Sequence, residues 1–119
     1  MVKLVCLLKR KKGLSFEEFK DYYENNHAHL ANGHLTEAVK YERRYLTPAM
    51  PGYLESDEEP PGMYDCLTEV WFESREDMEE NLAVLADPEK AAAVIEDEER
   101  FLDRPQLRFF VVEEECQLT

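Results

Sequence analysis

The pattern of apolar and polar positions along the chain predicts four strands and two helical regions. The predicted strands are short runs rich in apolar and β-branched side chains, at residues 2–8, 38–46, 64–72 and 107–114. The first helix is predicted from Ser15 to about Ala31. Ser15 and Glu18 have the spacing of a capping box, and Asn32-Gly33 is a typical stop.

The second helical region is predicted to begin at Ser74 and to restart at Asp87-Pro88, where aspartate caps and proline is tolerated. The order strand, helix, strand, strand, helix, strand is that of a ferredoxin-like βαββαβ fold. We therefore predict an α+β protein in which a four-stranded antiparallel sheet carries helices on one face, with one domain over residues 1–119. Residues 47–63 hold four of the six prolines and a block of acids. They are predicted to form a loop that either closes over a pocket or extends away from the fold.

The predicted strands do not alternate cleanly between apolar and polar positions, as strands with one wet face would. In the first strand, one side carries Val2, Leu4, Cys6 and Leu8, and the other carries Val5 and Leu7. Two helices cover only one face of a sheet, so the second apolar face needs another cover. A second copy of the chain is the simplest cover, which predicts a homodimer with sheets face to face.

Two of the three histidines, His27 and His29, lie in the first predicted helix. At about 100° per residue, the core-facing stripe of that helix consists of Phe16, Phe19, Tyr23, His27 and Leu30. His29 and Tyr22 are predicted to point outward, so the two histidines cannot chelate one ion and no metal site is predicted. His27, on an apolar stripe, is either a core residue with a structural hydrogen bond or a general acid/base in an apolar pocket.

A carboxylate in the second helical region is a candidate partner for His27. If one helix runs through residues 91–103, Glu98 falls on its apolar stripe, with Asp97 and Glu99 beside it. Both helical regions lie on the same face of the predicted sheet, so His27 and Glu98 could meet there. Such a contact would be either a catalytic pair, with the carboxylate fixing the imidazole tautomer, or a structural hydrogen bond.

The composition limits partners and location. A formal net charge of −13, from 27 acidic and 14 basic residues, disfavours nucleic acid and anionic membrane surfaces as partners. No apolar run approaches the roughly 20 residues of a membrane span. The three cysteines lie far apart in the sequence and have no CxxC spacing, and no leader sequence precedes them. This pattern is typical of reduced thiols in a cytoplasmic protein.

Three segments resemble the EthD family of the dimeric α+β barrel superfamily. They are KKGLSFEEFKDYYENNH at 11–27, YDCLTEVWF at 64–72 and EDEERFLD at 96–103, and the later two resemble fungal-type members. The resemblance implies a ferredoxin-like protomer, a homodimer, and cofactor-free chemistry on aromatic polyketide-like molecules in a pocket between helices and sheet. Relatives include decarboxylases and dehydratases of anthraquinone-type pathways and polyketide cyclases. The family's motif histidine corresponds to His27.

The leading hypothesis is a homodimeric, cofactor-independent decarboxylase or dehydratase acting on an aromatic polyketide-type acid. His27 would transfer the proton, Glu98 or Asp97 would orient its ring, and Tyr23 would hydrogen-bond a developing oxyanion. Three aromatic side chains are predicted to stack on the planar substrate, namely Phe19, Tyr45 and Trp71. Alternative hypotheses are an aldol-type cyclase, a cofactor-free monooxygenase and a non-catalytic small-molecule-binding dimer.

Overall fold

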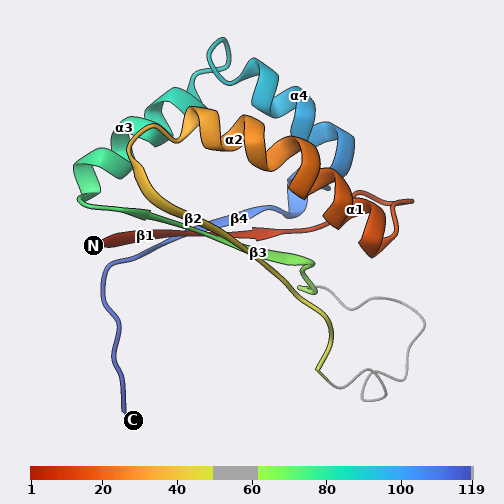
Figure 1. Cartoon of the computed structure of the whole chain (residues 1–119), viewed down its shortest axis with the longest axis horizontal. Helices are drawn as coiled ribbons and strands as arrows, with labels where there is room; N and C mark the ends of the chain where they lie inside the picture. Colours follow the sequence, from red (N-terminus) through yellow and green to blue (C-terminus); the bar gives the residue numbers. More distant parts are fainter. Residues whose placement is uncertain (50–61, 119) are drawn as a thin grey trace.

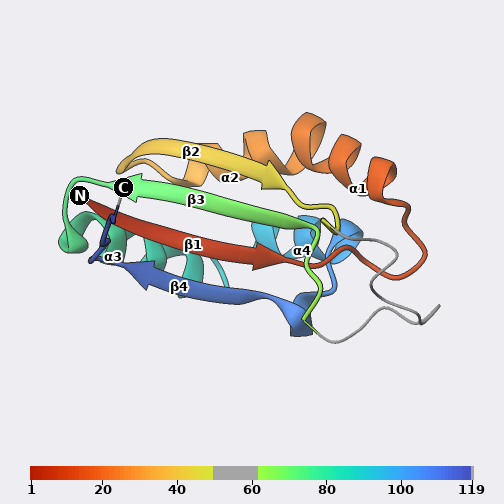
Figure 2. The same cartoon turned by 90° about the horizontal axis from the view of Figure 1, so that it is seen from below.

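The computed structural model describes residues 1–49 and 62–118, so the predicted loop at 47–63 lies mostly outside the described residues. One four-stranded antiparallel sheet has the strand order β2-β3-β1-β4. Its strands are β1 (Val2–Leu8), β2 (Ala38–Tyr45), β3 (Cys66–Phe72) and β4 (Arg108–Val112). Figure 1 shows the helices packed on one face, and Figure 2 shows the opposite face uncovered. The predicted ferredoxin-like α+β fold is confirmed.

The first helical region is longer than predicted and contains a turn of a different kind. It consists of α1 (Phe16–Tyr22), a π-helix η1 (Tyr23–His27) and α2 (Ala28–His34). The capping box is confirmed, since Ser15 Oγ accepts from the Glu18 N–H at 3.1 Å and Glu18 Oε1 accepts from the Ser15 N–H at 3.0 Å. The predicted stop at Asn32-Gly33 was wrong. The helix continues through Gly33 and ends where the Leu35 N–H donates to the carbonyl of Ala31.

The second helical region is divided into α3 (Arg75–Ala86) and α4 (Ala92–Phe101), followed by a short 3₁₀ helix, η3 (Arg104–Gln106). The predicted cap at Asp87 is present, because Asp87 Oδ1 accepts from the Glu89 N–H at 3.0 Å. The turn that it caps does not become a helix, however, and α4 begins at Ala92. Among the described residues, none of the helices is long and apolar enough to cross a membrane.

The core lies between the helices and the inner face of the sheet. On β1 the predicted inward positions Leu4, Cys6 and Leu8 are buried. Phe101 of α4 is fully buried and stacks on Phe19 of α1, with 5.7 Å between ring centroids. Large apolar and aromatic side chains on both layers thus hold α1, η1 and α4 against the sheet.

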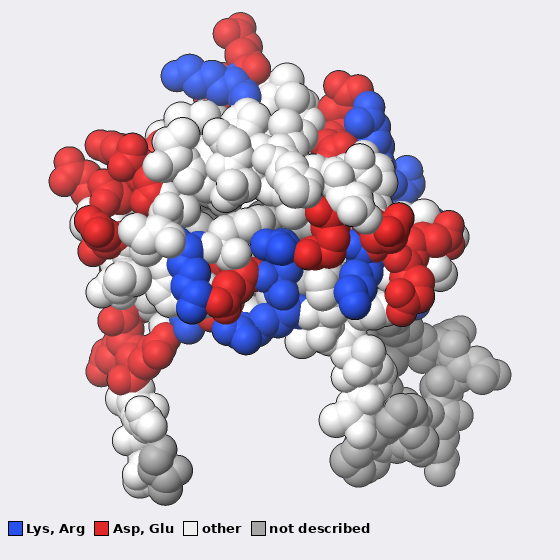
Figure 3. All heavy atoms as spheres, in the orientation of Figure 1, with Lys and Arg blue, Asp and Glu red and all other residues white. Residues whose placement is uncertain are grey.

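The outer face of the sheet is only partly apolar. The strand registers place Val5, Leu67 and Phe110 on this face. Charged side chains of the same face form ion pairs across the strands, such as Lys3 with Glu69 at 2.9 Å. The predicted second apolar face is therefore a mixture of apolar and paired charged positions. Figure 3, which views the sheet along its edge, also shows basic and acidic side chains side by side at the level of the strands.

Candidate active site

A cavity of about 550 Å³ lies between the helical layer and the inner face of the sheet. Most of its lining is apolar, including Leu4, Leu8, Val70, Leu82, Val94 and Leu107. His27 reaches it from η1, and Tyr41 and Thr68 reach it from β2 and β3. A few polar groups in a largely apolar cavity of this size are typical of a small-molecule site.

His27 and Asp97 form a buried pair beside this cavity. His27 Nδ1 lies 2.9 Å from Asp97 Oδ2, and the two residues are only 7% and 5% exposed. Burial lowers the pKa of His27, and the hydrogen bond to Asp97 opposes that shift without cancelling it. The imidazole is therefore neutral near pH 7. Because the Asp97 carboxylate only accepts hydrogen bonds, Nδ1 carries the proton and Nε2 holds the free lone pair.

Asp97 is held in place by three donors. Its Oδ1 accepts from the Tyr22 hydroxyl at 2.5 Å and from Arg100 Nη1 at 3.2 Å, while Oδ2 faces His27. Burial acts to raise the pKa of Asp97, but the hydrogen bonds from Tyr22 and His27 outweigh it, and the pKa is lowered. Asp97 is thus an ionised carboxylate that fixes the orientation of the His27 ring.

The predicted contact between His27 and Glu98 is not present. Consecutive residues of an α-helix differ by about 100° in direction, so Asp97 faces the first helical region and Glu98 lines the cavity. The prediction that Tyr22 points outward was also wrong. Its ring packs on Phe101 at 5.3 Å between centroids, and its hydroxyl bonds Asp97.

The π-helix places Tyr23 and His27 on the same side of the helical region. A π-helix closes its hydrogen bonds over five residues, here from the Ala28 N–H to the Tyr23 carbonyl, and such turns are frequent at functional sites. The two rings meet with 5.7 Å between centroids. Arg43 of β2 binds both carboxylate oxygens of Glu24 at 2.7 and 2.9 Å, which fastens η1 to the sheet.

Three hydroxyl groups form a chain along the cavity. The Tyr23 hydroxyl lies 2.7 Å from the Tyr41 hydroxyl and 2.7 Å from Thr68 Oγ1. Burial raises the pKa of Tyr23 well above its usual range, so this hydroxyl stays protonated. Three hydroxyls carry three protons and the two bonds use two of them, which leaves one for a further acceptor. That proton belongs to an end of the chain when Tyr23 donates one bond and accepts the other.

The three aromatic residues predicted to stack on a substrate do not line the cavity. Phe19 is fully buried against Phe101. The Tyr45 hydroxyl donates to Glu24 at 2.5 Å. Trp71 pairs with Lys3 in the strand register and therefore lies on the outer face of the sheet. Among described aromatic residues, the cavity lining instead contains Tyr23, Tyr41 and Phe109.

Several residues of the site were missed by the sequence reasoning. Tyr41 alternates with Arg43 and Tyr45 along β2, which is a signal for one shared face. Arg100 stands three residues after Asp97, a spacing that brings helical side chains together. Tyr22 lies in the regular helix α1, three residues after the buried Phe19, and this spacing was likewise a signal that the two side chains lie on neighbouring sides of the helix.

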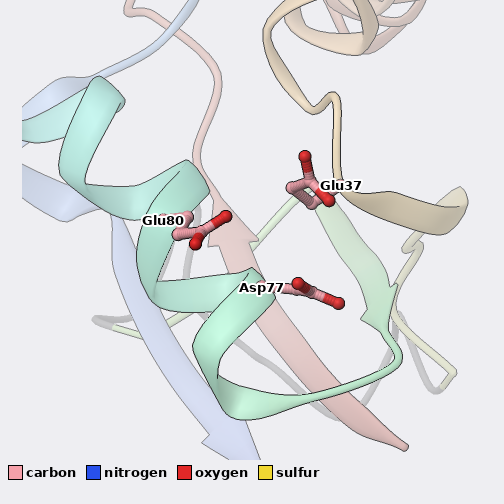
Figure 4. A group of neighbouring side chains, drawn as sticks. All are labelled: Glu37, Asp77 and Glu80. Carbon is pink, nitrogen blue, oxygen red and sulfur yellow. The ribbon is translucent and has the colours of Figure 1, made fainter.

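Two other kinds of group could carry chemistry, namely a carboxylate cluster that could bind a metal and the buried cysteines. Neither belongs to the His27–Asp97 pair. Figure 4 shows Glu37, Asp77 and Glu80, whose oxygens lie within 4.8 Å of one another among the described residues. Two of these side chains are exposed and the third is half-buried, as expected for a strongly acidic surface, and we assign no metal to them. Burial raises the pKa of Cys6 and of Cys66 to about 12, so neither is a thiolate nucleophile.

Comparisons with known proteins bear on the fold and the family. No similar sequence is found among curated proteins. A structure from Arabidopsis thaliana is 20% identical, with 100% of each chain covered and a TM-score of 0.62. An EthD family protein from Bacillus halodurans is 17% identical, covering 97% of this chain and 99% of its own, with a TM-score of 0.64. A dimeric protein of ferredoxin-like fold from Bacteroides fragilis is 14% identical, with 95% of each chain covered and a TM-score of 0.57.

The structural likenesses, at these identities, show the fold alone. The family comparison goes further, because the EthD domain matches residues 11–105. This range begins in the loop after β1, contains η1 and α4 with the His27–Asp97 pair, and ends within η3. The chain therefore belongs to the EthD domain family.

Proposed function

We propose that this protein is a cofactor-independent lyase that acts on an aromatic polyketide-type acid, with His27 as general acid/base. The observation that carries the proposal is the 2.9 Å contact between His27 Nδ1 and Asp97 Oδ2 beside a largely apolar cavity. When a carboxylate bonds Nδ1 and so fixes the imidazole ring, the free Nε2 is suited to accept and return a proton. The cavity volume of about 550 Å³ is ample for a planar molecule of a few fused rings.

The resting protonation state of His27 favours dehydration within this class. Neutral Nε2 would take a proton from the carbon next to a substrate carbonyl, and the electron pair would move to the carbonyl oxygen as an enolate. The hydroxyl chain of Tyr23, Tyr41 and Thr68 would donate a hydrogen bond to that oxygen. As the enolate collapses, the β carbon–oxygen bond breaks, and the leaving hydroxide takes the proton from Nε2–H and departs as water.

Decarboxylation is the second candidate and differs in its first step. Loss of CO₂ leaves an electron pair on carbon that must be protonated, so His27 would have to start as imidazolium. Burial lowers the pKa of His27, which makes that starting state scarce at neutral pH. The preference for dehydration therefore follows from the environment of the histidine.

We also propose that the protein works as a homodimer. Apolar side chains remain uncovered on β4, where Phe109 and Phe110 are 58% and 52% exposed in the single chain. Such aromatic exposure on an edge strand is typical of a contact surface. The Bacteroides fragilis neighbour is described as dimeric, which supports the same arrangement here. Sedimentation analysis of the wild type and a Phe110→Glu variant tests it, and a wild-type monomer would refute it.

The test of the catalytic proposal compares His27→Gln with His29→Gln. Both histidines lie in the first helical region, but His29 is exposed and its side chain makes no hydrogen bond to the described residues. A set of β-hydroxy aromatic polyketide acids is incubated with each protein. Mass spectrometry of the products then shows whether water or CO₂ has been lost. We expect His27→Gln to lose about 10²- to 10⁴-fold in rate while His29→Gln retains it.

Four results would contradict or change the proposal. Turnover by a folded His27→Gln variant at the wild-type rate would refute the assigned role. Ring closure without loss of water would indicate an aldol-type cyclase, and oxygen uptake would indicate a monooxygenase. Acids that raise the melting temperature and are recovered unchanged would indicate a binding protein.

A further inference from the structure

The charge of the chain creates a difficulty for any protein that takes an acid as substrate. A formal net charge of −13 repels a carboxylate over most of the surface. Within the described lining of the cavity, the formally charged side chains are Glu98 and Arg104, since His27 is neutral. Arg104 is therefore the cation that the cavity offers to an anionic ligand.

Arg104 lies where the cavity meets the surface. An open groove of about 740 Å³ adjoins the cavity, and Leu102 and Arg104 line both. Lys11 and Lys12 also line the groove, so three cations lie there against the two anions Glu99 and Asp103. The groove and the adjoining Glu98 together carry as many cations as anions, so this part of the surface repels an anion less than the strongly acidic remainder does.

The guanidinium of Arg104 has N–H donors that make no hydrogen bond to the described residues. Its Nε lies 3.9 Å from Glu98 Oε2, which is a loose ion pair, and its side chain is 41% exposed. No hydrogen bond from this guanidinium to another group occurs in the described part of the chain. A guanidinium carries five N–H donors in a planar fork that matches a carboxylate in bidentate fashion.

We propose that Arg104 is a specificity-determining residue that binds the carboxylate of the substrate at the junction of groove and cavity. This inference rests on the proposed function, and it adds that the bound carboxylate is retained during the reaction. Arg104 stabilises a carboxylate in the ground state, and loss of CO₂ from that group would forfeit the ion pair. The carbon that reacts is then a different one, near His27.

Glu98 explains how a second carboxylate is accommodated beside Arg104. Burial raises the pKa of Glu98, although the Arg104 charge opposes the shift. An arriving carboxylate that shares the Arg104 charge weakens the one interaction that opposes the rise, so the pKa of Glu98 moves further up and proton uptake by Glu98 becomes more favourable. Binding of an acid is therefore coupled to proton uptake, and binding of a neutral analogue is not.

The experiment uses two probes of nearly the same shape, the anionic 1-hydroxy-2-naphthoic acid and the neutral 1-hydroxy-2-naphthamide. Titration calorimetry at pH 7 measures both affinities for the wild type and for Arg104→Gln, Arg104→Lys, Glu98→Gln and Arg75→Gln. Arg75→Gln removes the same charge from an exposed arginine on α3 that pairs with Glu79, away from the cavity lining. Melting temperatures confirm that each variant folds.

We expect the wild type to prefer the acid, and Arg104→Gln to weaken acid binding about 10- to 100-fold with less than about a twofold change for the amide. Arg104→Lys should retain part of the preference, and Arg75→Gln all of it. Glu98→Gln should tighten acid binding and abolish proton uptake, measured by repeating the titration in buffers of different ionisation enthalpy.

Two results would overturn the assignment. One is an unaltered protein that binds both probes equally or binds neither. The other is an Arg104→Gln variant that weakens both probes alike or weakens neither. Failure of the proposed function is separately visible, because a His27→Gln variant with undiminished turnover would refute the lyase while the charge preference of Arg104 stood.

Discussion

Replacing Asp97 by asparagine removes the charge beside His27 without changing the size of the side chain. The geometry dictates how the new amide is oriented. Tyr22 and Arg100 both donate to Oδ1, so the amide oxygen takes that position. The amide NH₂ then occupies the position of Oδ2, 2.9 Å from His27 Nδ1. Nδ1 has to accept a hydrogen bond, and the ring proton moves to Nε2, which can no longer act as a base.

The expected loss of rate follows from the loss of the Nε2 lone pair, which acts as the general base. A positioned general base contributes about 10² to 10⁴ in rate, so Asp97→Asn should lose most of that range at pH 7. The free energy of unfolding should fall by about 1 to 3 kcal/mol, because the bonds with Tyr22, Arg100 and His27 remain in number but lose the carboxylate charge. The variant should therefore fold and bind substrate with little change in affinity.

The tautomer can be read without a substrate. Long-range ¹H–¹⁵N correlation spectra distinguish a protonated from an unprotonated ring nitrogen, and His27→Gln identifies the His27 signals. We expect Nε2 to be unprotonated in the wild type and protonated in Asp97→Asn. Glu99→Gln is the matched control, since it removes an exposed charge two residues away. An Asp97→Asn variant with unprotonated Nε2, or with turnover within tenfold of the wild type, would refute the reasoning.

Three further predictions concern the dyad, the hydroxyl chain and the π-helix. Because burial lowers the pKa of His27, kcat/KM should rise with pH to a plateau through a midpoint below 6.5, recorded as a pH–rate profile. Tyr41→Phe should lower kcat about 10- to 100-fold with KM little changed, in steady-state kinetics, because an end of the hydroxyl chain is lost. Hydrogen bonds from Arg43 lower the pKa of Glu24 to about 2, so its stabilising effect is complete above the usual glutamate pKa and is lost as the pH falls through about 2. Thermal unfolding of Glu24→Gln should lack this part of the acid dependence.

The spacing of residues in the first helical region predicted part of the site and missed another part for one physical reason. The observed inward residues follow a step of four, namely Phe19, Tyr23, His27, Ala31 and Leu35. A stripe drawn for a regular α-helix included Tyr23 and His27 but continued to Leu30. The extra residue of the π-helix shifts the direction of the following turns, so Ala31 lines the cavity instead.

The strand pattern predicted the order of strands along the chain and an antiparallel sheet, but it could not assign single aromatic residues to the faces of that sheet. Alternation alone leaves the direction of Trp71 open, and only the register with Lys3 places it on the outer face. The same limit applied to Tyr41, which lies opposite Val70 on the inner face. The register between strands that are distant in sequence decides both cases, and the sequence of a single strand does not determine that register.

Asp97 and Glu98 show how neighbouring carboxylates acquire different chemistry from their surroundings. The direction of each side chain on α4 determines its partners, so Asp97 meets three hydrogen-bond donors and Glu98 meets an apolar cavity. The pKa of Asp97 is lowered by those donors, and the pKa of Glu98 is raised by burial. A lowered pKa keeps Asp97 charged, as a residue that orients His27 must be. A raised pKa lets Glu98 exchange a proton, as a residue that shares Arg104 with an incoming acid must do. Interchanging the two roles would leave His27 without a fixed tautomer and the cavity with a permanent negative charge facing its ligand.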